Sequence, residues 1–180
     1  MESNKVLHTS VYFTRKDITE LTEIVSQLTG DNIDLLAKLM DLEATYPDFY
    51  KWYLFKVLPD LRHRPNARKI LLTISEIRDG SNIVKRLTGL AIIKKRIRER
   101  KICTFRVFPE YRHQGIGTLL FQYCMTFLET QKPLISISDK ALNAFEPFIE
   151  KYEWTLCEVL PDYYKKGITE YVFNGFLKKN

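Results

Sequence analysis

One short glycine-containing segment carries residues whose types and spacing could hold an anion. It reads Arg112-His113-Gln114-Gly115-Ile116-Gly117 and lies between a strand-like stretch and an amphipathic helical stretch. The first N–H groups of a helix lack partners inside the helix and carry the positive end of its dipole. Because such a helix start is a natural site for phosphate, we predict a phosphate-binding turn at this position.

The two glycines of this turn suit close contact with a ligand. Since Gly115 and Gly117 have no side chains, they let the backbone approach phosphate oxygens and tolerate turn conformations that other residues avoid. Arg112 and His113 add positive charge or hydrogen-bond donors at the rim. The alternative is that the glycines only permit a tight turn from strand to helix, although one glycine would normally suffice.

Two familiar nucleotide-binding patterns do not match this turn. A P-loop requires Gly, four residues and then Gly-Lys-Ser/Thr, which the chain lacks. The dinucleotide fingerprint requires a third glycine three residues after the second, where this chain has Leu120. Asp139 lies at a suitable sequence distance for a ribose ligand, but no further strand–helix–strand unit precedes or follows this one.

The stretch from Phe105 to Leu120 resembles motif A of the GNAT superfamily of N-acetyltransferases. It reads FRVFPEYRHQGIGTLL, and the family pattern is a strand ending in Val-x-Pro followed by Arg/Gln-x-x-Gly-x-Gly/Ala. Every defining position is filled, and the order of elements along nearly the whole chain is also similar. The resemblance implies acetyl-CoA as cosubstrate and an acceptor amine on a small molecule, a protein or an aminoacyl-tRNA.

The resemblance also implies which residues hold acetyl-CoA. Backbone groups of strand residues would pair with the pantetheine arm as if it were another strand, and these are Phe105, Arg106 and Val107. Backbone N–H groups of the turn would hold the pyrophosphate, namely those of Gln114, Gly115, Ile116, Gly117 and Thr118. Arg112 and His113 at the rim complete the set, with Asn143, which matches an Asn that the family often has before its next helix.

The usual proton donor of the family is missing from its usual place. GNAT proteins often have a tyrosine in that next helix, whereas the aligned residue here is Ile149. Candidate replacements are Tyr152, one helical turn later, and Tyr163 or Tyr164 in the loop before the last predicted strand. The reference pKa of tyrosine, about 10, is near the thiol value of about 8.5. Each tyrosine could instead be an ordinary packed aromatic, with water as the proton source.

A general base is needed because an alkyl amine, with a reference pKa of about 10.4, is mostly protonated at neutral pH. Glu76, at the end of a predicted strand, is a candidate base, directly or through water; its alternative is a surface carboxylate. Cys103 lies on the strand beside the expected thioester site, where a packed thiol is favoured over a covalent role. We predict no metal site, because His8, His63 and His113 lack metal-ligand spacing.

We therefore expect direct transfer of an acetyl group to a primary amine of unknown identity. The alternatives are a non-catalytic module that binds acetyl-CoA, or an acetyltransferase directed at RNA through aminoacyl-tRNA. The basic run Lys94–Lys101 reads either as a solvated hairpin tip or as a contact for RNA phosphates or the CoA 3′-phosphate. The aromatic segment from Tyr46 to Phe55 reads as core or as an acceptor pocket, with core favoured.

The elements that must position these residues form a mixed α/β pattern. Together with the resemblance, it predicts a mostly antiparallel sheet of about seven strands flanked by helices, in one domain spanning residues 1–180. Strands are expected over residues 6–13, 69–77, 86–93, 102–107, 134–138, 155–160 and 168–176. Helices are expected over residues 14–29, 33–40, 47–57, 115–129 and 144–152, with a loop between Pro59 and Pro65 and a fresh helix start at Pro147.

Bulk composition fits this organisation. A chain of 180 residues with 45% hydrophobic content can form one domain with a full core. The net charge of +6 is compatible with an anionic ligand, an acidic substrate or RNA. Three cysteines at unrelated spacings read as reduced thiols, and no apolar stretch reaches the roughly 20 residues of a membrane span. We expect a soluble cytoplasmic protein without membrane contact. The sequence leaves open whether the protein forms a homodimer.

Overall fold

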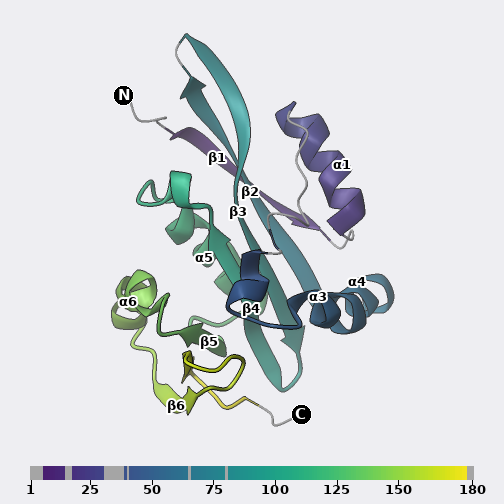
Figure 1. Ribbon diagram of the computed structural model, residues 1–180. Helices are drawn as coiled ribbons and strands as arrows, with labels where there is room; N and C mark the ends of the chain where they lie inside the picture. Colours follow the sequence, from purple (N-terminus) through teal and green to yellow (C-terminus); the bar gives the residue numbers. More distant parts are fainter. Residues whose placement is uncertain are drawn as a thin grey trace.

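Two antiparallel sheets form the centre of the molecule (Figure 1). The larger sheet has the order β1-β2-β3-β4, with bounds Val6–Thr14, Arg68–Asp79, Asn82–Arg96 and Glu99–Val107. The smaller has the order β5-β7-β6, with bounds Ile135–Ser138 for β5, Leu156–Pro161 for β6 and Thr169–Phe173 for β7. The computed structural model describes residues 6–14, 18–30, 39, 41–64, 66–79 and 81–177. The predicted fold, with its seven mostly antiparallel strands, is confirmed.

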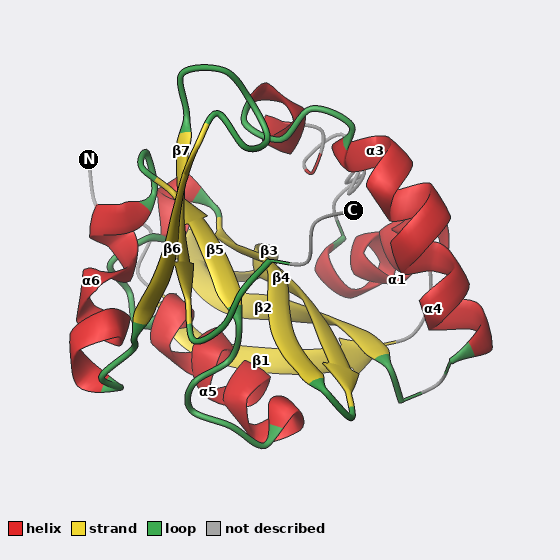
Figure 2. Cartoon of the chain, turned by 90° about the horizontal axis from the view of Figure 1, so that it is seen from below, coloured by secondary structure: helices red, strands yellow, loops and turns green. Residues whose placement is uncertain are grey.

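Helices cover both sides of the sheets (Figure 2). The described helices are α1 (Ile18–Thr29), η1 (Asp41–Ala44), α3 (Phe49–Trp52), η2 (Tyr53–Val57), α4 (Leu58–His63), η3 (Pro109–Tyr111), α5 (Ile116–Leu128) and α6 (Leu142–Lys151). None of the described helices is both long and apolar enough to span a lipid bilayer. The helix expected over residues 33–40 falls almost entirely outside the described residues.

Alternation along β3 divides the hydrophobic core in two. Leu90 and Ile92 are buried against α1 and the α3–α4 segment, whereas Ala91 and Ile93 are buried against α5. Successive strand residues point to opposite faces of a sheet, so a strand buried on both faces is apolar throughout. The α3–α4 segment and the turn at the start of α5 therefore lie on opposite faces of the sheet.

The aromatic segment is mostly core, as favoured from the sequence, but it continues further than expected. Phe49 and Tyr53 are buried, while Phe55 is 72% exposed. The predicted loop after Pro59 is wrong, because the helix continues through this proline to His63. A π-helical turn precedes it, and widened turns of this kind can accommodate a proline ring without ending a helix.

The fresh helix start predicted at Pro147 is also wrong. α6 begins at Leu142 and contains this proline in its interior. The helix buries no residue completely, so water can reach the carbonyl group that loses its N–H partner to the proline. The helix therefore places Asn143 in its first turn, near the start of the functional cleft described below.

The basic run Lys94–Lys101 belongs mainly to strands. Residues 94–96 end β3, residues 99–101 begin β4, and only Ile97 and Arg98 form the turn between them. In this hairpin Lys94 pairs with Lys101 and Arg96 with Glu99. Paired residues of neighbouring strands project to the same face of a sheet, so these charges are held in fixed rows.

Candidate active site

A cleft begins where β4 and β5 separate. The Ile102 N–H donates to the Leu134 carbonyl at 3.0 Å, and the Leu134 N–H donates to the Arg100 carbonyl at 2.8 Å. Beyond this bridge the described residues form no hydrogen bond between the two strands, which are opened like the arms of a V. The cleft has a volume of about 1900 Å³, larger than the roughly 300–1,000 Å³ of typical ligand pockets.

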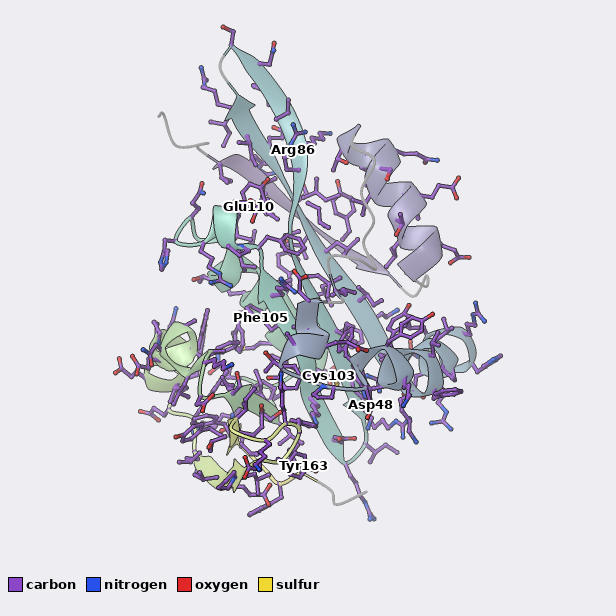
Figure 3. The ribbon with its side chains drawn as sticks, viewed as in Figure 1. Asp48, Arg86, Cys103, Phe105, Glu110 and Tyr163 are labelled. Atoms are coloured by element: carbon purple, nitrogen blue, oxygen red, sulfur yellow. The ribbon has the colours of Figure 1, made fainter. Side chains whose placement is uncertain are left out.

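A β-bulge on β4 lies at the mouth of the V. β3 pairs Ile92 with Thr104 and Ile93 with Ile102, so Cys103 is an extra residue in β4. Bulges bend a strand and re-aim its side chains, often beside active sites. Cys103 and Phe105 line the cleft together with Asp48 and Tyr163, and Figure 3 shows Cys103 nearer than Phe105 to Asp48 and Tyr163. The strand edge beyond the bulge presents backbone groups that an extended ligand can pair with.

The turn before α5 has the geometry of an anion site. Gly115 precedes the helix with φ 79°, and His113 also has a positive φ of 61°. The first hydrogen bond into the helix runs from the Leu119 N–H to the Gly115 carbonyl at 3.1 Å, so the preceding N–H groups of the first turn have no intrahelical acceptor. A Cβ added at Gly115 would meet no atom within 4 Å, which shows that the turn is open.

Glycine at position 117 keeps the cleft side of this turn clear. A Cβ there would lie 3.6 Å from the Val107 side chain, an ordinary contact, while any longer side chain would enter the cleft that Gly117 lines. The Gln114 side chain accepts a hydrogen bond from the Val6 N–H at 3.1 Å, which ties the turn to β1. The turn is thus fixed to the sheet while its amides stay accessible.

The structure brings most of the expected acetyl-CoA residues to the cleft. Its lining includes Phe105, Arg106, Val107, Arg112, His113, Gly117 and Asn143. The side chains of Gln114, Ile116 and Thr118 do not line it; Ile116 is buried under the turn, and only backbone groups of these residues could serve. Among the described residues there is no group of three or more His, Cys, Asp or Glu side chains that could hold a metal ion.

Of the three expected catalytic residues, only Tyr164 lines the cleft. Tyr152 follows α6 and stacks on Phe121 in the core, with ring centroids 6.1 Å apart. Glu76 lies on β2 opposite Lys85 of β3, away from the cleft. The structure therefore does not bring Glu76 and Tyr152 together with the bulge and the phosphate turn.

A buried carboxylate that the sequence reasoning missed lies behind the cleft wall. Glu170 of β7 is completely buried, and neither carboxylate oxygen has a hydrogen-bond partner of normal geometry among the described residues. Burial raises its pKa to about 7, although Ser136 and Tyr46 lie close enough to lower it in part. Ser136 and Tyr46, whose hydroxyl groups lie near this carboxylate, both line the cleft.

Two tyrosines enclose this carboxylate. Tyr46 and Tyr164 meet edge to face, with ring centroids 5.4 Å apart. Burial of the phenol raises the pKa of Tyr164 to about 12, although 39% of the whole residue is exposed. Burial, followed by the Glu170 charge, also raises the pKa of Tyr46 above its ordinary value. Both phenols are therefore neutral hydrogen-bond donors at physiological pH.

The sequence did contain a signal for Glu170. Ile168, Glu170 and Val172 alternate along the last strand, and all three are buried. A charged residue on the apolar side of such an alternation indicates a buried carboxylate that is held for a reason other than solubility.

Comparisons with known proteins agree with this geometry. A family model described as an acetyltransferase (GNAT) domain matches residues 78–171, more than half of the chain. A Desulfovibrio desulfuricans protein assigned to the GNAT family is similar in structure, with a TM-score of 0.53 at 13% identity over 92% of this chain and 97% of that chain. The comparison with curated proteins found no match.

A second solved structure supports the same fold. The ribosomal-protein-S18-alanine N-acetyltransferase from Escherichia coli gives a TM-score of 0.51 at 12% identity, over 91% of this chain and 92% of that chain. Identities this low establish only a common fold, whereas the family model covers β3, β4, the phosphate turn and most of the smaller sheet. The chain therefore belongs to the GNAT family of acetyltransferases and is an acetyl-CoA-dependent N-acetyltransferase.

Proposed function

We propose that the protein transfers an acetyl group directly from acetyl-CoA to a primary amine. This proposal rests on one observation. The cleft between β4 and β5 is continuous with the open turn at the start of α5. A single cleft therefore contains a free strand edge, which can pair with the pantetheine arm of acetyl-CoA, and an anion site, which can hold its diphosphate. Acetyl-CoA supplies the electrophilic thioester carbon, so the protein must hold it, exclude water and manage protons.

The phosphate turn and β4 would divide the binding of the cosubstrate. The N–H groups of residues 114–118 would hold the diphosphate, with Arg112 and His113 at the rim. Backbone groups of residues 105–107 would pair with the pantetheine arm. A donor near Val107 would stabilise the negative charge that develops on the carbonyl oxygen during transfer.

Glu170 is our candidate acceptor for the proton of the attacking amine. Its carboxylate would take that proton through the hydroxyl group of Ser136 or Tyr46, because it does not itself reach the cleft. A pKa of about 7 suits this task, since the group is ionised in part at neutral pH and still basic enough to accept a proton. Glu170 replaces Glu76 as the candidate base, because Glu76 lies away from the cleft.

Tyr164 is better suited to donate a hydrogen bond than to give up its proton. Its pKa of about 12 exceeds the thiol reference value of about 8.5, so complete transfer to a departing thiolate would be unfavourable. A hydrogen bond from the phenol would still stabilise the negative sulfur. CoA can then leave as the thiolate and take up a proton in bulk solvent after its release, since the thiol reference pKa is only about 8.5.

We further propose a cytoplasmic location. Cys103, Cys124 and Cys157 are all free thiols, which a reducing compartment would maintain. Assembly into a homodimer stays a prediction.

The activity itself is tested by a screen of amine acceptors with detection of free thiol. We expect acceptor-dependent thiol release with at least one primary amine, in a panel that includes aminoacyl-tRNA. Tight binding of acetyl-CoA without acceptor-dependent release would instead identify a binding module. Binding of tRNA no stronger than that of heparin would count against an RNA acceptor.

Gly117→Leu tests the phosphate turn. The leucine side chain would enter the cleft beside Val107, so we expect the affinity for acetyl-CoA to fall by at least about tenfold, or 1.4 kcal/mol. Gly117→Ala is the control, since its methyl group makes only ordinary contact, and it should bind far better than the leucine variant. Calorimetric titration measures the affinity, and circular dichroism checks folding. Unchanged affinity in a folded Gly117→Leu variant would contradict the assignment of the turn.

Glu170→Gln tests the proton acceptor. The wild-type kcat should rise with pH through an apparent pKa near 7, and the variant should lose that limb while keeping any rise at higher pH that comes from the amine itself. We expect kcat to fall by about 10²–10⁴-fold at pH 7.5, the usual effect of removing a general base. A full pH–rate profile for both proteins decides the matter. If the variant keeps the rise of kcat near pH 7, that rise comes from the titration of another group.

The same substitution should stabilise the protein at high pH. The folded-state pKa of Glu170, about 7, lies above its ordinary value of 4.5, so the folded state binds more protons and wild-type stability falls as pH rises between these values. Replacing the buried carboxylate by a neutral amide should raise the free energy of unfolding by about 1–3 kcal/mol at pH 8, and by less at pH 5. Urea unfolding at both pH values measures this difference. A variant that is less stable than wild type at pH 8 would show that the carboxylate contributes to folding.

A further inference from the structure

A row of positive side chains crosses three neighbouring strands at one end of the cleft. Arg68 of β2 pairs with Lys94 of β3, which pairs in turn with Lys101 of β4. Directly paired residues project to the same face of the sheet, and all three line the cleft. Like charges placed directly opposite one another destabilise a sheet, so this row is unfavourable for folding alone.

Carboxylates neutralise only part of this charge. Asp60, which is buried, accepts hydrogen bonds from Arg68 at 3.2 Å, from Arg96 at 2.9 Å and from Arg64 at 3.2 Å. We call these four residues the Asp60 cluster. One carboxylate shared by three guanidinium groups leaves the cluster with a net positive charge, and burial of Arg68 and Asp60 fixes its geometry.

Two further cations lie beside the cluster without an ion-pair partner. Lys94 pairs with Glu99, but neither Lys101 nor Arg98 forms an ion pair with any other residue in the described ranges. The opposite face of the hairpin differs, because Lys95 and Arg100 both contact Glu129 at the end of α5. That face keeps a smaller excess of positive charge, because one carboxylate is shared there by two cations, and the larger excess lies on the face of the hairpin that lines the cleft.

This positive end lies far from the phosphate turn. β4 runs from Glu99 to Val107, and nine strand residues span about 25 Å. The phosphates of a cosubstrate held at the start of α5 would lie at the Val107 end. The cations at the Glu99 end therefore face the space that remains for the acceptor.

The acidic residues at this end offset only part of the charge, including the part of the Lys101 charge on which Glu170 acts. Asp48 lines the cleft but pairs with Lys51 at 2.8 Å, and Asp60 and Glu99 are already engaged. Glu170 lies behind the wall. A polyamine would meet a surplus of like charge here, whereas an amine that carries an anionic group would be attracted.

We infer that the acceptor is a primary amine that also carries a phosphate or carboxylate group, which binds Lys101, Arg98 and the Asp60 cluster. This inference rests on the proposed function, because it specifies the acceptor of that transfer. Lys101 lies two to four residues from the Cys103–Phe105 edge along β4, so the amine and the anionic group should be separated by about 10 Å.

Matched acceptors test the inference. We would measure kcat/KM with glucosamine 6-phosphate against glucosamine, with the C-terminally amidated peptide Ala-Ala-Glu-NH2 against Ala-Ala-Gln-NH2, and with spermidine. The anionic member of at least one pair should be preferred by tenfold or more, over its neutral partner and over spermidine, and the pair concerned identifies phosphate or carboxylate. The preference should weaken as salt is added. Equal or better turnover of both neutral partners, or a preference for spermidine, would overturn the inference.

Arg98→Glu is the principal variant, because this exposed turn residue can be reversed in charge without loss of a described ion pair. It should reduce the preference for the anionic acceptor over its neutral partner to about threefold or less. Lys101→Gln should act in the same direction. Lys151→Glu, an equal charge reversal on the exposed surface of α6 outside the cleft, should keep the full preference.

The failures of the two proposals are distinguishable. Turnover of neutral amines without any anion preference, or an Arg98→Glu variant that retains the full preference, would overturn this inference and leave the proposed function standing. Absence of thiol release with every amine would overturn the proposed function and this inference with it.

Discussion

The separation of β4 from β5 after a single bridge is the constraint on which the rest of the structure depends. Backbone N–H and C=O groups are strong hydrogen-bonding groups that a fold normally pairs, and here a strand edge in the middle of the molecule is left without its neighbour. β5 cannot close the gap because it pairs with β7 in the smaller sheet. The bulge at Cys103 bends β4 at the same point. The unpaired edge is thereby available to a ligand.

The chemistry of the site follows from what surrounds that edge. At the Val107 end, the open turn offers amides and a helix dipole to a diphosphate. At the Glu99 end, fixed cations favour an anionic group on the acceptor. Between them, hydroxyl groups of the cleft wall connect to the buried Glu170. The sites proposed for the cosubstrate, the proton acceptor and the acceptor therefore lie along or beside β4. The buried carboxylate and the row of like charges are expected to lower the stability of the fold.

The sequence predicted what depends on local pattern. The phosphate turn could be predicted because Gly115 and Gly117, one residue apart, lie between a strand and the start of a helix, and such a local motif is readable without knowledge of the fold. The strands were found for the same reason, with bounds that differ by a few residues. The loop expected after Pro59 and the helix start expected at Pro147 were wrong, because a π-helical turn accommodates the first proline and solvent exposure of α6 accommodates the second.

Features that depend on tertiary contacts escaped prediction. Glu170 lies 124 residues after Tyr46 in sequence. The pairing of β7 with β5 brings the carboxylate near Ser136, and the segment between η1 and α3 brings Tyr46 to the same place. The Asp60 cluster joins three separate segments in the same way. Glu76 and Tyr152 had suitable chemistry but lie on elements that point elsewhere, one on the outer part of a hairpin and one in the core beside Phe121. Chemical type alone could not decide between them and Glu170.

Amide hydrogen exchange measured with and without acetyl-CoA tests the central claim most directly. If the free edge of β4 and the start of α5 hold the cosubstrate, exchange should slow in peptides that cover residues 103–107 and 113–118. Peptides from β1 and the outer part of the β2–β3 hairpin, which lie outside the cleft, should keep their rates. Slower exchange at saturating acetyl-CoA that is confined to those outer strands, with none at the β4 edge or the turn, would contradict the account.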